Sequence, residues 1–165
     1  WLLAPPGNGM FYIRPAQQDS IWTPLCSSMW DDHQEGLYRF MQYGTGNKSL
    51  QAGLDAALDF HFRIGPERVR ARIRSLADRL RAGLQQIPGA RISSPLHPEL
   101  SGATVVYRVE GVPATKLEGD LWARKLIRVR SMGDHLGVRH SCHIYNSEAE
   151  IDATLEIVRD LARKL

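Results

Sequence analysis

The sequence feature that most constrains this fold is an apolar stripe at helical spacing between residues 69 and 87. Its members are Val69, Ile73, Leu76, Leu80, Leu84 and Ile87. Pro66 suits the first turn of a helix, and Pro88-Gly89 ends the pattern. A helix with one apolar face is stabilised mainly by packing that face against other elements. The stripe therefore predicts a long helix against the core of an ordered domain.

Three further helices are predicted from spacing and from helix-start signals. One covers residues 48–63, with an apolar face made of Leu50, Leu54, Ala57, Leu58 and Phe62. A capping-box spacing from Thr115 to Glu118 predicts a helix that ends near Lys125. A second capping box, Ser147 to Glu150, opens the last helix. Its inward stripe is Ile151, Leu155, Val158, Leu161 and Leu165.

Short β-rich runs between these helices are predicted to be strands. They cover residues 9–14, 20–23, 91–93, 103–109, 127–130 and 138–143. From residue 48 the order is helix, helix, strand, strand, helix, strand, strand, helix. This order indicates an α+β domain with a small, mainly antiparallel sheet and flanking helices.

The segment 15–47 has no clean period and contains several aromatic residues, namely Trp22, Trp30, Tyr38, Phe40 and Tyr43. A loop of this length inside a compact domain is usually functional or packed against a partner. We expect its aromatic residues to pack on the parent core, or to line a substrate entrance or a dimer contact.

Composition narrows the class of partner. No apolar run approaches the roughly 20 residues that a membrane-spanning helix needs, so no membrane partner is expected. The net charge is only +3. The arginines of the 66–87 helix, at positions 68, 70, 72, 74, 79 and 81, are mixed with Glu67 and Asp78. This mixture favours a solvated helix face over a nucleic-acid site. Cys26 and Cys142 follow no disulfide or metal spacing, so we expect free, buried thiols.

The turn Gly44-Thr45-Gly46-Asn47, just before the 48–63 helix, is a candidate anion site. Free backbone N–H groups and the positive end of a helix dipole attract anions, and glycines allow a phosphate to approach closely. Spacing alone favours the simpler interpretation, an ordinary loop with Asn47 as the helix N-cap.

A second candidate is the run from Gly137 to Asn146, which contains Arg139, His140 and His143. A guanidinium binds a carboxylate bidentately and stays charged at any working pH. The simpler interpretation of Arg139 is a surface ion pair at a strand edge. The two histidines are three residues apart on a predicted strand, where they point to opposite faces, so solvated or hydrogen-bonded side chains are expected and no metal site.

Three segments together resemble class V aminotransferases of the isopenicillin-N-epimerase-like branch. Residues 1–14 resemble the stretch that follows the cofactor lysine, and Gly44-Thr45 resembles the phosphate-binding pair of that family. Arg139-x-Ser-x-x-x-Tyr-Asn, followed by Glu150-Ile151-Asp152, resembles the strand and helix start that carry the carboxylate-binding arginine. One departure is Gly46, where the family often has arginine.

The resemblance implies pyridoxal 5'-phosphate (PLP) as cofactor and an amino acid as substrate. It assigns Gly44 and Thr45 to the cofactor phosphate of the neighbouring subunit, and Arg139 to the substrate α-carboxylate. In the family, the Schiff-base lysine stands directly before the position of Trp1. The resemblance therefore implies that this chain contains no catalytic residue. The resemblance further implies a cytoplasmic homodimer with shared active sites.

The expected layout is that of a C-terminal part of such an enzyme. Residues 1–47 are interpreted as a remnant of the large PLP-binding domain with an active-site loop, and residues 48–165 as the C-terminal α+β small domain. The chain alone is expected to be inactive. Aminotransfer, epimerisation at Cα and C–S lyase chemistry stay open, whereas desulfurase activity is disfavoured because residues 111–137 contain no cysteine.

Two alternatives remain open at this point. One is a non-catalytic basic α+β module that binds an acidic partner or nucleic acid through its arginine-rich helix. The other is a degenerate or regulatory homologue that has kept the fold and lost the cofactor.

Overall fold

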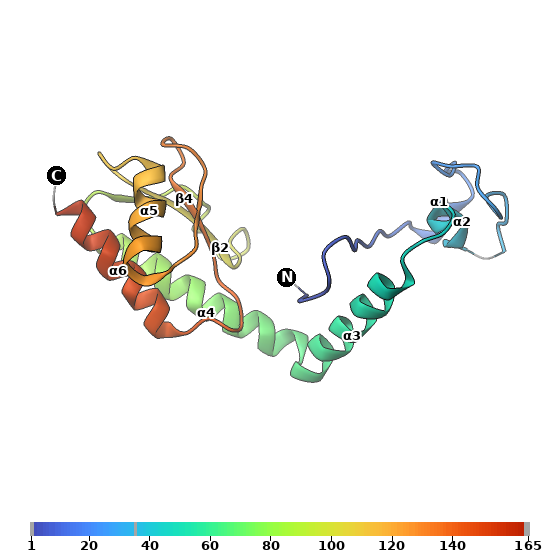
Figure 1. Ribbon diagram of the computed structural model, residues 1–165, viewed down its shortest axis with the longest axis horizontal. Helices are drawn as coiled ribbons and strands as arrows, with labels where there is room; N and C mark the ends of the chain where they lie inside the picture. The colour runs from blue at the N-terminus through green and yellow to red at the C-terminus, as the bar shows by residue number, and fades with distance from the viewer. Residues whose placement is uncertain (1, 35, 164–165) are drawn as a thin grey trace. The chain divides into compact units, whose positions relative to one another are not determined.

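The computed structural model describes residues 2–34 and 36–163, and the chain divides into two compact units after Arg63 (Figure 1). Trp1, the residue expected next to the cofactor lysine, and Leu165, the last member of the final apolar stripe, lie outside the described residues. The boundary predicted at residue 47 concerns the layout of a whole enzyme and stays a prediction.

The second unit is built on a four-stranded antiparallel sheet. Its strands are β1 (Ala90–Ile92), β2 (Thr104–Val109), β3 (Arg130–Ser131) and β4 (Val138–Ser141), in the order β1-β2-β4-β3. Every pairing is antiparallel, so the predicted α+β class with a small antiparallel sheet is confirmed. β3 begins three residues later than predicted and β4 ends two residues earlier.

Three helices, α4 (Pro66–Gln85), α5 (Ala114–Lys125) and α6 (Glu148–Ala162), pack with this sheet around one hydrophobic core (Figure 1). Alternate residues of β2 and β4 contribute Val105, Tyr107, Val109 and Val138 to the core. The predicted stripes of α4 and α6 supply much of the rest, including Leu76, Leu80, Leu84, Ile151 and Val158. The other face of the sheet carries the alternate residues, which are half-buried on β2 and exposed on β4.

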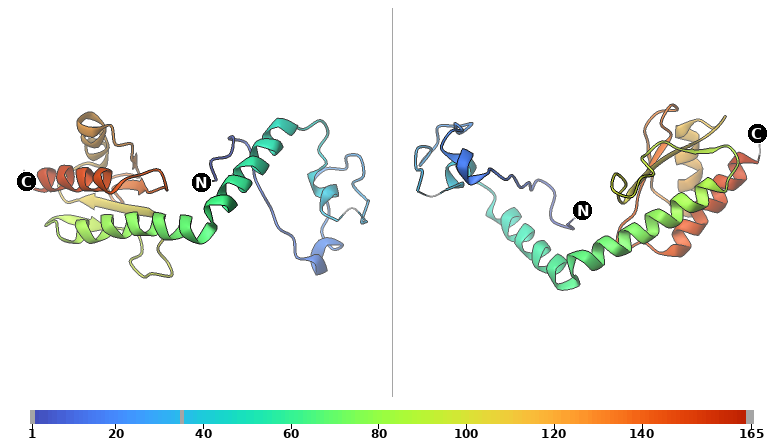
Figure 2. Two further views of the ribbon diagram at one scale, coloured as in Figure 1. Left: turned by 90° about the horizontal axis from the view of Figure 1, so that it is seen from below. Right: turned by 180° about the vertical axis from the view of Figure 1, so that it is seen from behind.

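α4 and α6 run side by side (Figures 1 and 2). A Cβ atom at Gly83 would lie 2.2 Å from Leu155 Cδ1, so the absence of a side chain allows this close approach. Arg79 donates to both carboxylate oxygens of Asp152 at 2.7 and 2.8 Å, and Arg72 forms an ion pair with Glu148.

The expectation of a solvated arginine face on α4 is therefore wrong in part. Arg81 is buried at 6% exposure and donates to Asp78 Oδ1 at 2.7 Å and to the Gly102 carbonyl at 2.5 Å. A helical sequence pattern does not reveal such tertiary partners, since Gly102 belongs to a distant loop.

The two predicted capping boxes have different outcomes. At α6 the box is present: Ser147 Oγ accepts from Glu150 N, and the Glu150 side chain accepts from Ser147 N at 2.7 Å. At α5 the predicted box is wrong, because the helix begins at Ala114 and Thr115 already lies inside it. There Asp134 takes the capping role, accepting from Ala114 N at 2.7 Å.

The first unit contains α1 (Pro15–Gln18), α2 (Tyr38–Met41) and most of α3 (Lys48–Ile64). The strands predicted at 9–14 and 20–23 are wrong, because neither segment pairs with a strand among the described residues and residues 20–21 lie in a turn and bend. Arg39 organises the irregular segment instead: it is 4% exposed, donates to the carbonyls of Gln18 and Ile21, and lies over the Phe40 ring.

The predicted helix at 48–63 is present as α3, but its apolar face is largely uncovered within the first unit. Ala57 is the only buried residue of α3, and Phe62 is 66% exposed. Leu50, Leu54 and Leu58 instead line a groove of about 800 Å³. No helix formed by the described residues is long and apolar enough to span a bilayer.

Candidate functional site

The turn before α3 leaves several backbone donors available. Asn47 is the N-cap, because its Oδ1 accepts from Ser49 N at 3.1 Å. Among the described residues, Thr45 and Gly46 make no hydrogen bond of their own, and Thr45 is exposed. N-capping by Asn47 and anion binding by the residues before it are therefore compatible.

The glycines shape this turn. Gly44 has φ +109°, which side-chain-bearing residues rarely adopt, and nothing lies within 4 Å of the position of its missing Cβ. At Gly46 a Cβ would lie 2.8 Å from Tyr43 Oη. The backbone on the Gly44 side is therefore open to a ligand, at the positive end of a 17-residue helix.

Arg139 lies on β4, on the sheet face opposite the hydrophobic core. Its neighbours on the strand, Val138 and His140, are buried, whereas Arg139 and Ser141 are exposed. In register, Arg139 is flanked by Val106 on β2 and by Arg130 on β3. The Arg139 side chain has no hydrogen-bond or ion-pair partner among the described residues, so the surface ion pair considered from sequence is absent from this part of the chain.

Two buried residues that follow Arg139, His140 and Cys142, are kept uncharged by burial. Desolvation lowers the pKa of His140 to about 4, with a smaller opposing effect from Glu150, so its imidazole is neutral near pH 7. Burial likewise raises the pKa of the Cys142 thiol to about 11. The expectation of solvated or hydrogen-bonded histidines is thus wrong for His140: it is buried, and its Nδ1 has no hydrogen-bond partner among the described residues.

Cys142 is buried as predicted, whereas Cys26 is exposed, so the expectation of a buried thiol is wrong there. The loop that holds Cys26 lies outside the hydrophobic core. Among the described residues, no three His, Cys, Asp or Glu side chains gather into a possible metal site.

The turn after β4 is fixed by Asn146. Its Oδ1 accepts from His143 N at 2.8 Å, its carbonyl accepts from Arg72 at 2.9 Å, and its Nδ2 donates to Glu150 at 3.4 Å. The Tyr145 ring stacks on His143 at 4.6 Å between centroids. Asn146 thus joins the end of β4 to the start of α6, whereas Tyr145 stacks within the turn itself.

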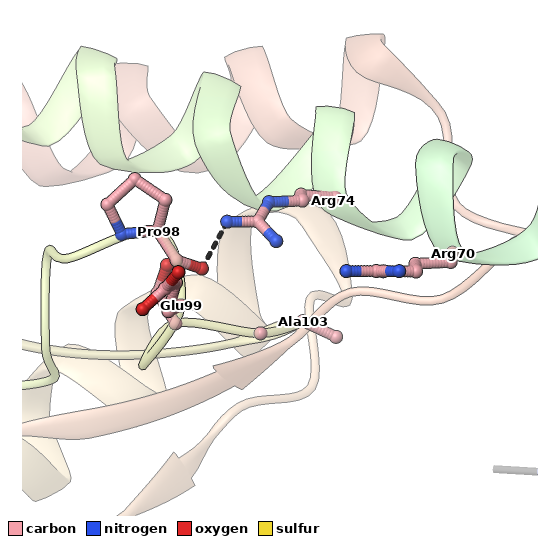
Figure 3. Close-up of a pocket in the computed structure, with 7 residues that line it drawn as sticks. Arg70, Arg74, Pro98, Glu99 and Ala103 are labelled. Atoms are coloured by element: carbon pink, nitrogen blue, oxygen red, sulfur yellow. Dashed lines mark hydrogen bonds between the residues drawn. The ribbon is translucent and has the colours of Figure 1, made fainter. Parts of the chain in front are cut away.

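A separate cleft of about 310 Å³ lies between α4 and the segment 98–103 (Figure 3). Arg70 and Arg74 line it, and Arg74 donates to the Pro98 carbonyl. Glu99 lies beside them. Arg72, Arg74 and Arg79 of the arginine-rich helix thus all have partners within the second unit.

Comparison with known proteins identifies the family. The family model described as aminotransferase class V matches residues 2–154. This chain belongs to the class V aminotransferase family. It is 31% identical to isopenicillin N epimerase of Streptomyces clavuligerus, over 92% of this chain and 42% of that protein. It is 24% identical to a probable hercynylcysteine sulfoxide lyase of Mycobacterium tuberculosis, over 94% of this chain and 41% of that protein.

Solved structures agree with this assignment. A cysteine desulfurase from Thermococcus onnurineus NA1 superposes with a TM-score of 0.78 at 25% identity, covering 93% of this chain and 42% of that one. The cystine C–S lyase C-DES superposes with a TM-score of 0.64 at 27% identity, over 76% of this chain and 32% of that one. The chain thus spans less than half the length of these relatives.

Membership of this family indicates PLP as the cofactor. The residues present suit its phosphate end: the open backbone at Gly44 and the unpaired amides of Thr45 and Gly46 stand at a helix N-terminus. The sequence pointed to these residues and to Arg139. It held no signal for Arg39, Arg81 or Asp134, whose partners are distant along the chain.

Proposed function

We propose that this chain is the C-terminal part of a PLP-dependent class V enzyme that acts on an amino acid. The observation that carries the proposal is Arg139, an exposed guanidinium without a side-chain partner among the described residues. It lies in a sequence that resembles the family motif with the carboxylate-binding arginine. PLP, when bound, supplies an electron sink for charge that develops at the substrate Cα.

Each proposed role follows from the chemistry of the residue. Arg139 binds the substrate α-carboxylate through two parallel N–H···O bonds and so orients the substrate. The turn at Gly44 and Thr45 binds the cofactor phosphate through backbone N–H groups and the Thr45 hydroxyl, across the interface of a homodimer. The lysine that holds the cofactor directly precedes Trp1. On this proposal the 165 residues alone are inactive.

The upstream sequence and the cofactor spectrum test the cofactor assignment. We expect a lysine codon directly before the codon of Trp1, and visible PLP absorbance in the purified full-length protein that disappears when this lysine is replaced by alanine. Any other residue before Trp1 contradicts the lysine assignment. A full-length protein without PLP absorbance supports the degenerate-homologue alternative instead.

The role of Arg139 is tested by kinetics of the full-length protein. Arg139→Ala should raise KM for the amino-acid substrate by about tenfold to a hundredfold, because a charge-assisted bidentate contact is lost. Arg139→Lys should recover only part of this loss, since an ammonium binds a carboxylate as a point charge. Unchanged KM and kcat in Arg139→Ala exclude Arg139 from the site.

Shared active sites are tested by complementation between two variants. A full-length Thr45→Val, Gly44→Ala double variant and an Arg139→Ala variant should each be impaired. If the phosphate turn acts across the dimer, mixed dimers contain one site with both features intact. Mixing under conditions of subunit exchange should then restore activity. Mixtures no more active than the parents contradict the cross-subunit assignment.

The reaction type is decided by products. Class V chemistry on an amino acid leads here to a keto acid, to the opposite enantiomer or to a cleaved C–S bond. Chiral chromatography together with keto-acid and sulfur assays separates these outcomes. Similarity to isopenicillin N epimerase supports testing epimerisation first.

A further inference from the structure

The sheet face that carries Arg139 holds a second, directly opposed arginine. Arg130 on β3 is the register partner of Arg139 on β4. Both residues are exposed, and each follows a buried residue, Val129 and Val138 respectively. Side chains directly opposite on antiparallel strands have Cβ atoms about 4.5–5.5 Å apart and lie on the same face. The two guanidinium groups can therefore reach one small molecule.

No carboxylate of the described residues neutralises this pair. The side chains of Arg130 and Arg139 have no ion-pair or hydrogen-bond partner among the described residues. The neighbouring positions on this face carry no acidic residue: Val106 and Thr104 on β2 and Ser141 on β4 are uncharged, and Arg108 on β2 is basic. Like charges directly opposite on a sheet destabilise the fold, and a bound anion relieves that repulsion.

The two other arginines on this sheet are placed differently. Arg91 and Arg108 face each other on β1 and β2. Arg91 donates to Glu110 at 2.9 Å, so its charge is already paired. Arg108 lies beyond Val106 along β2 and has no register partner on β4. Arg130 is therefore the arginine best placed to act together with Arg139.

We propose that Arg130 binds a second acidic group of the substrate, so that the substrate is an amino acid with an anionic side chain. This inference rests on the proposed function, in which Arg139 binds the α-carboxylate. Arg130 then determines specificity: its guanidinium binds a side-chain carboxylate or sulfonate next to the carboxylate held by Arg139. A substrate with a neutral side chain leaves the Arg130 charge uncompensated beside Arg139, so its binding free energy is less favourable.

Binding of matched acid and amide pairs tests this proposal. Isothermal titration calorimetry of the full-length protein with its cofactor uses L-aspartate against L-asparagine, and L-glutamate against L-glutamine. L-Cysteate, a sulfonate, distinguishes a general anion site from a carboxylate site. We expect at least one acid to bind more tightly than its amide. Arg130→Gln should reduce that preference by about tenfold or more, the effect of losing a hydrogen bond between charged groups.

Three variants separate the possible outcomes. Arg130→Lys should keep part of the preference, because its charge remains. Arg68→Gln removes an exposed arginine of α4 and should change nothing. The unfolding midpoint of Arg130→Gln should not fall, because Arg130 has no partner to lose among the described residues and opposes a like charge. A lowered midpoint with unchanged preference identifies a structural role and overturns the proposal.

Failure of this inference differs from failure of the proposed function. If Arg139→Ala weakens binding of acids and amides alike while Arg130→Gln leaves their ratio unchanged, only the second subsite is refuted. The same holds if every amide binds as tightly as its acid, or if no acidic amino acid of the panel binds. If Arg139→Ala changes the binding of no amino acid, the carboxylate site itself is refuted.

Discussion

Adjacent residues on β4 have opposite chemistry. Arg139 is exposed and charged, while the next residue, His140, is buried and neutral near pH 7. Strand alternation produces this difference, since successive side chains point to opposite faces of the sheet. One short strand thus serves both the core and the proposed substrate site.

Burial of His140 predicts loss of stability in acid. Its pKa is about 4 in the folded chain and near the ordinary value of 6.5 when unfolded. Between these values the unfolded chain binds more protons, so stability falls as pH falls from 6.5 to 4. The expected loss from this residue between pH 7 and pH 4 is about 3 kcal/mol.

Urea unfolding at several pH values, followed by circular dichroism, measures this loss. His140→Asn is the control, because other groups also respond to acid. Arg72 holds the pKa of Glu148 down to about 2, so Glu148 loses stabilising contacts in strong acid in both proteins. If wild type and variant lose stability in parallel between pH 7 and pH 4, the assignment to His140 is wrong.

Gly137 predicts a large effect from a single methyl group. Its φ is +92°, and a Cβ there would lie 2.0 Å from the Tyr107 carbonyl oxygen on β2. Gly137→Ala should destabilise the chain by roughly 3 kcal/mol or more, because the contact is with backbone that cannot move aside. Gly133→Ala is the matched control: its φ is +84°, but nothing lies within 4 Å. Equal losses in urea unfolding would show that backbone conformation alone matters.

At the scale of elements, the start of α6 carries a measurable share of stability. Ser147 caps the helix and Glu150 completes the box. Ser147→Ala should cost about 1 kcal/mol, the usual value for loss of an N-cap. Ser75→Ala, on an exposed position inside α4, should cost nothing or stabilise slightly. Urea unfolding of both variants checks the difference.

Two glycines within helices should respond in opposite ways to alanine, because only Gly83 lies at the contact between α4 and α6. Gly83→Ala improves helix propensity but places a Cβ 2.2 Å from Leu155, so we expect net destabilisation. Gly119→Ala on α5 meets nothing within 4 Å and should stabilise by about 0.5–1 kcal/mol. Melting temperatures that rise for both variants would show that Leu155 repacks without cost.

The elements with long periodic patterns were predictable from sequence, and those defined by distant partners were not. Stripes of apolar residues located α4 and α6, and the Ser147 box located the first turn of α6. The Thr115 box failed because the carboxylate of Asp134, 20 residues from Ala114, caps α5 instead. The strand expected at 9–14 failed because strand formation depends on a neighbouring strand and not on composition alone.

The proposed site shows the same division. The motif around Arg139 marked its position, and the glycines marked the turn at 44–47. The opposition of Arg130 to Arg139 depends on strand register, which the sequence alone did not establish. β3 begins at Arg130 and not at the predicted residue 127. The pairing of β3 with β4 is what places Arg130 opposite Arg139.

At the scale of the whole chain, the two units differ in how much hydrophobic core each contains. Every residue of the hydrophobic core cluster lies between Leu76 and Ala162. In the first unit, Thr23, Arg39 and Ala57 are the buried residues among those described. We expect residues 64–165, expressed alone, to fold cooperatively, and residues 1–63 alone to remain largely unfolded unless a partner covers their apolar groove. Dispersed amide NMR signals from isolated 1–63 would contradict this expectation.

Gly137 has one more consequence, which concerns misfolding. The backbone of β2 at Tyr107 and Arg108 leaves no room for a Cβ at position 137, so the chain can approach β2 this closely only with a glycine just before β4. A slip of one residue would bring Val138 or Leu136 to that point and exchange the two faces of β4. Arg139 would then enter the core and His140 would face solvent. Such an alternative pairing carries both a steric clash and a buried charge, so the pairing of β2 with β4 is protected against a shifted register.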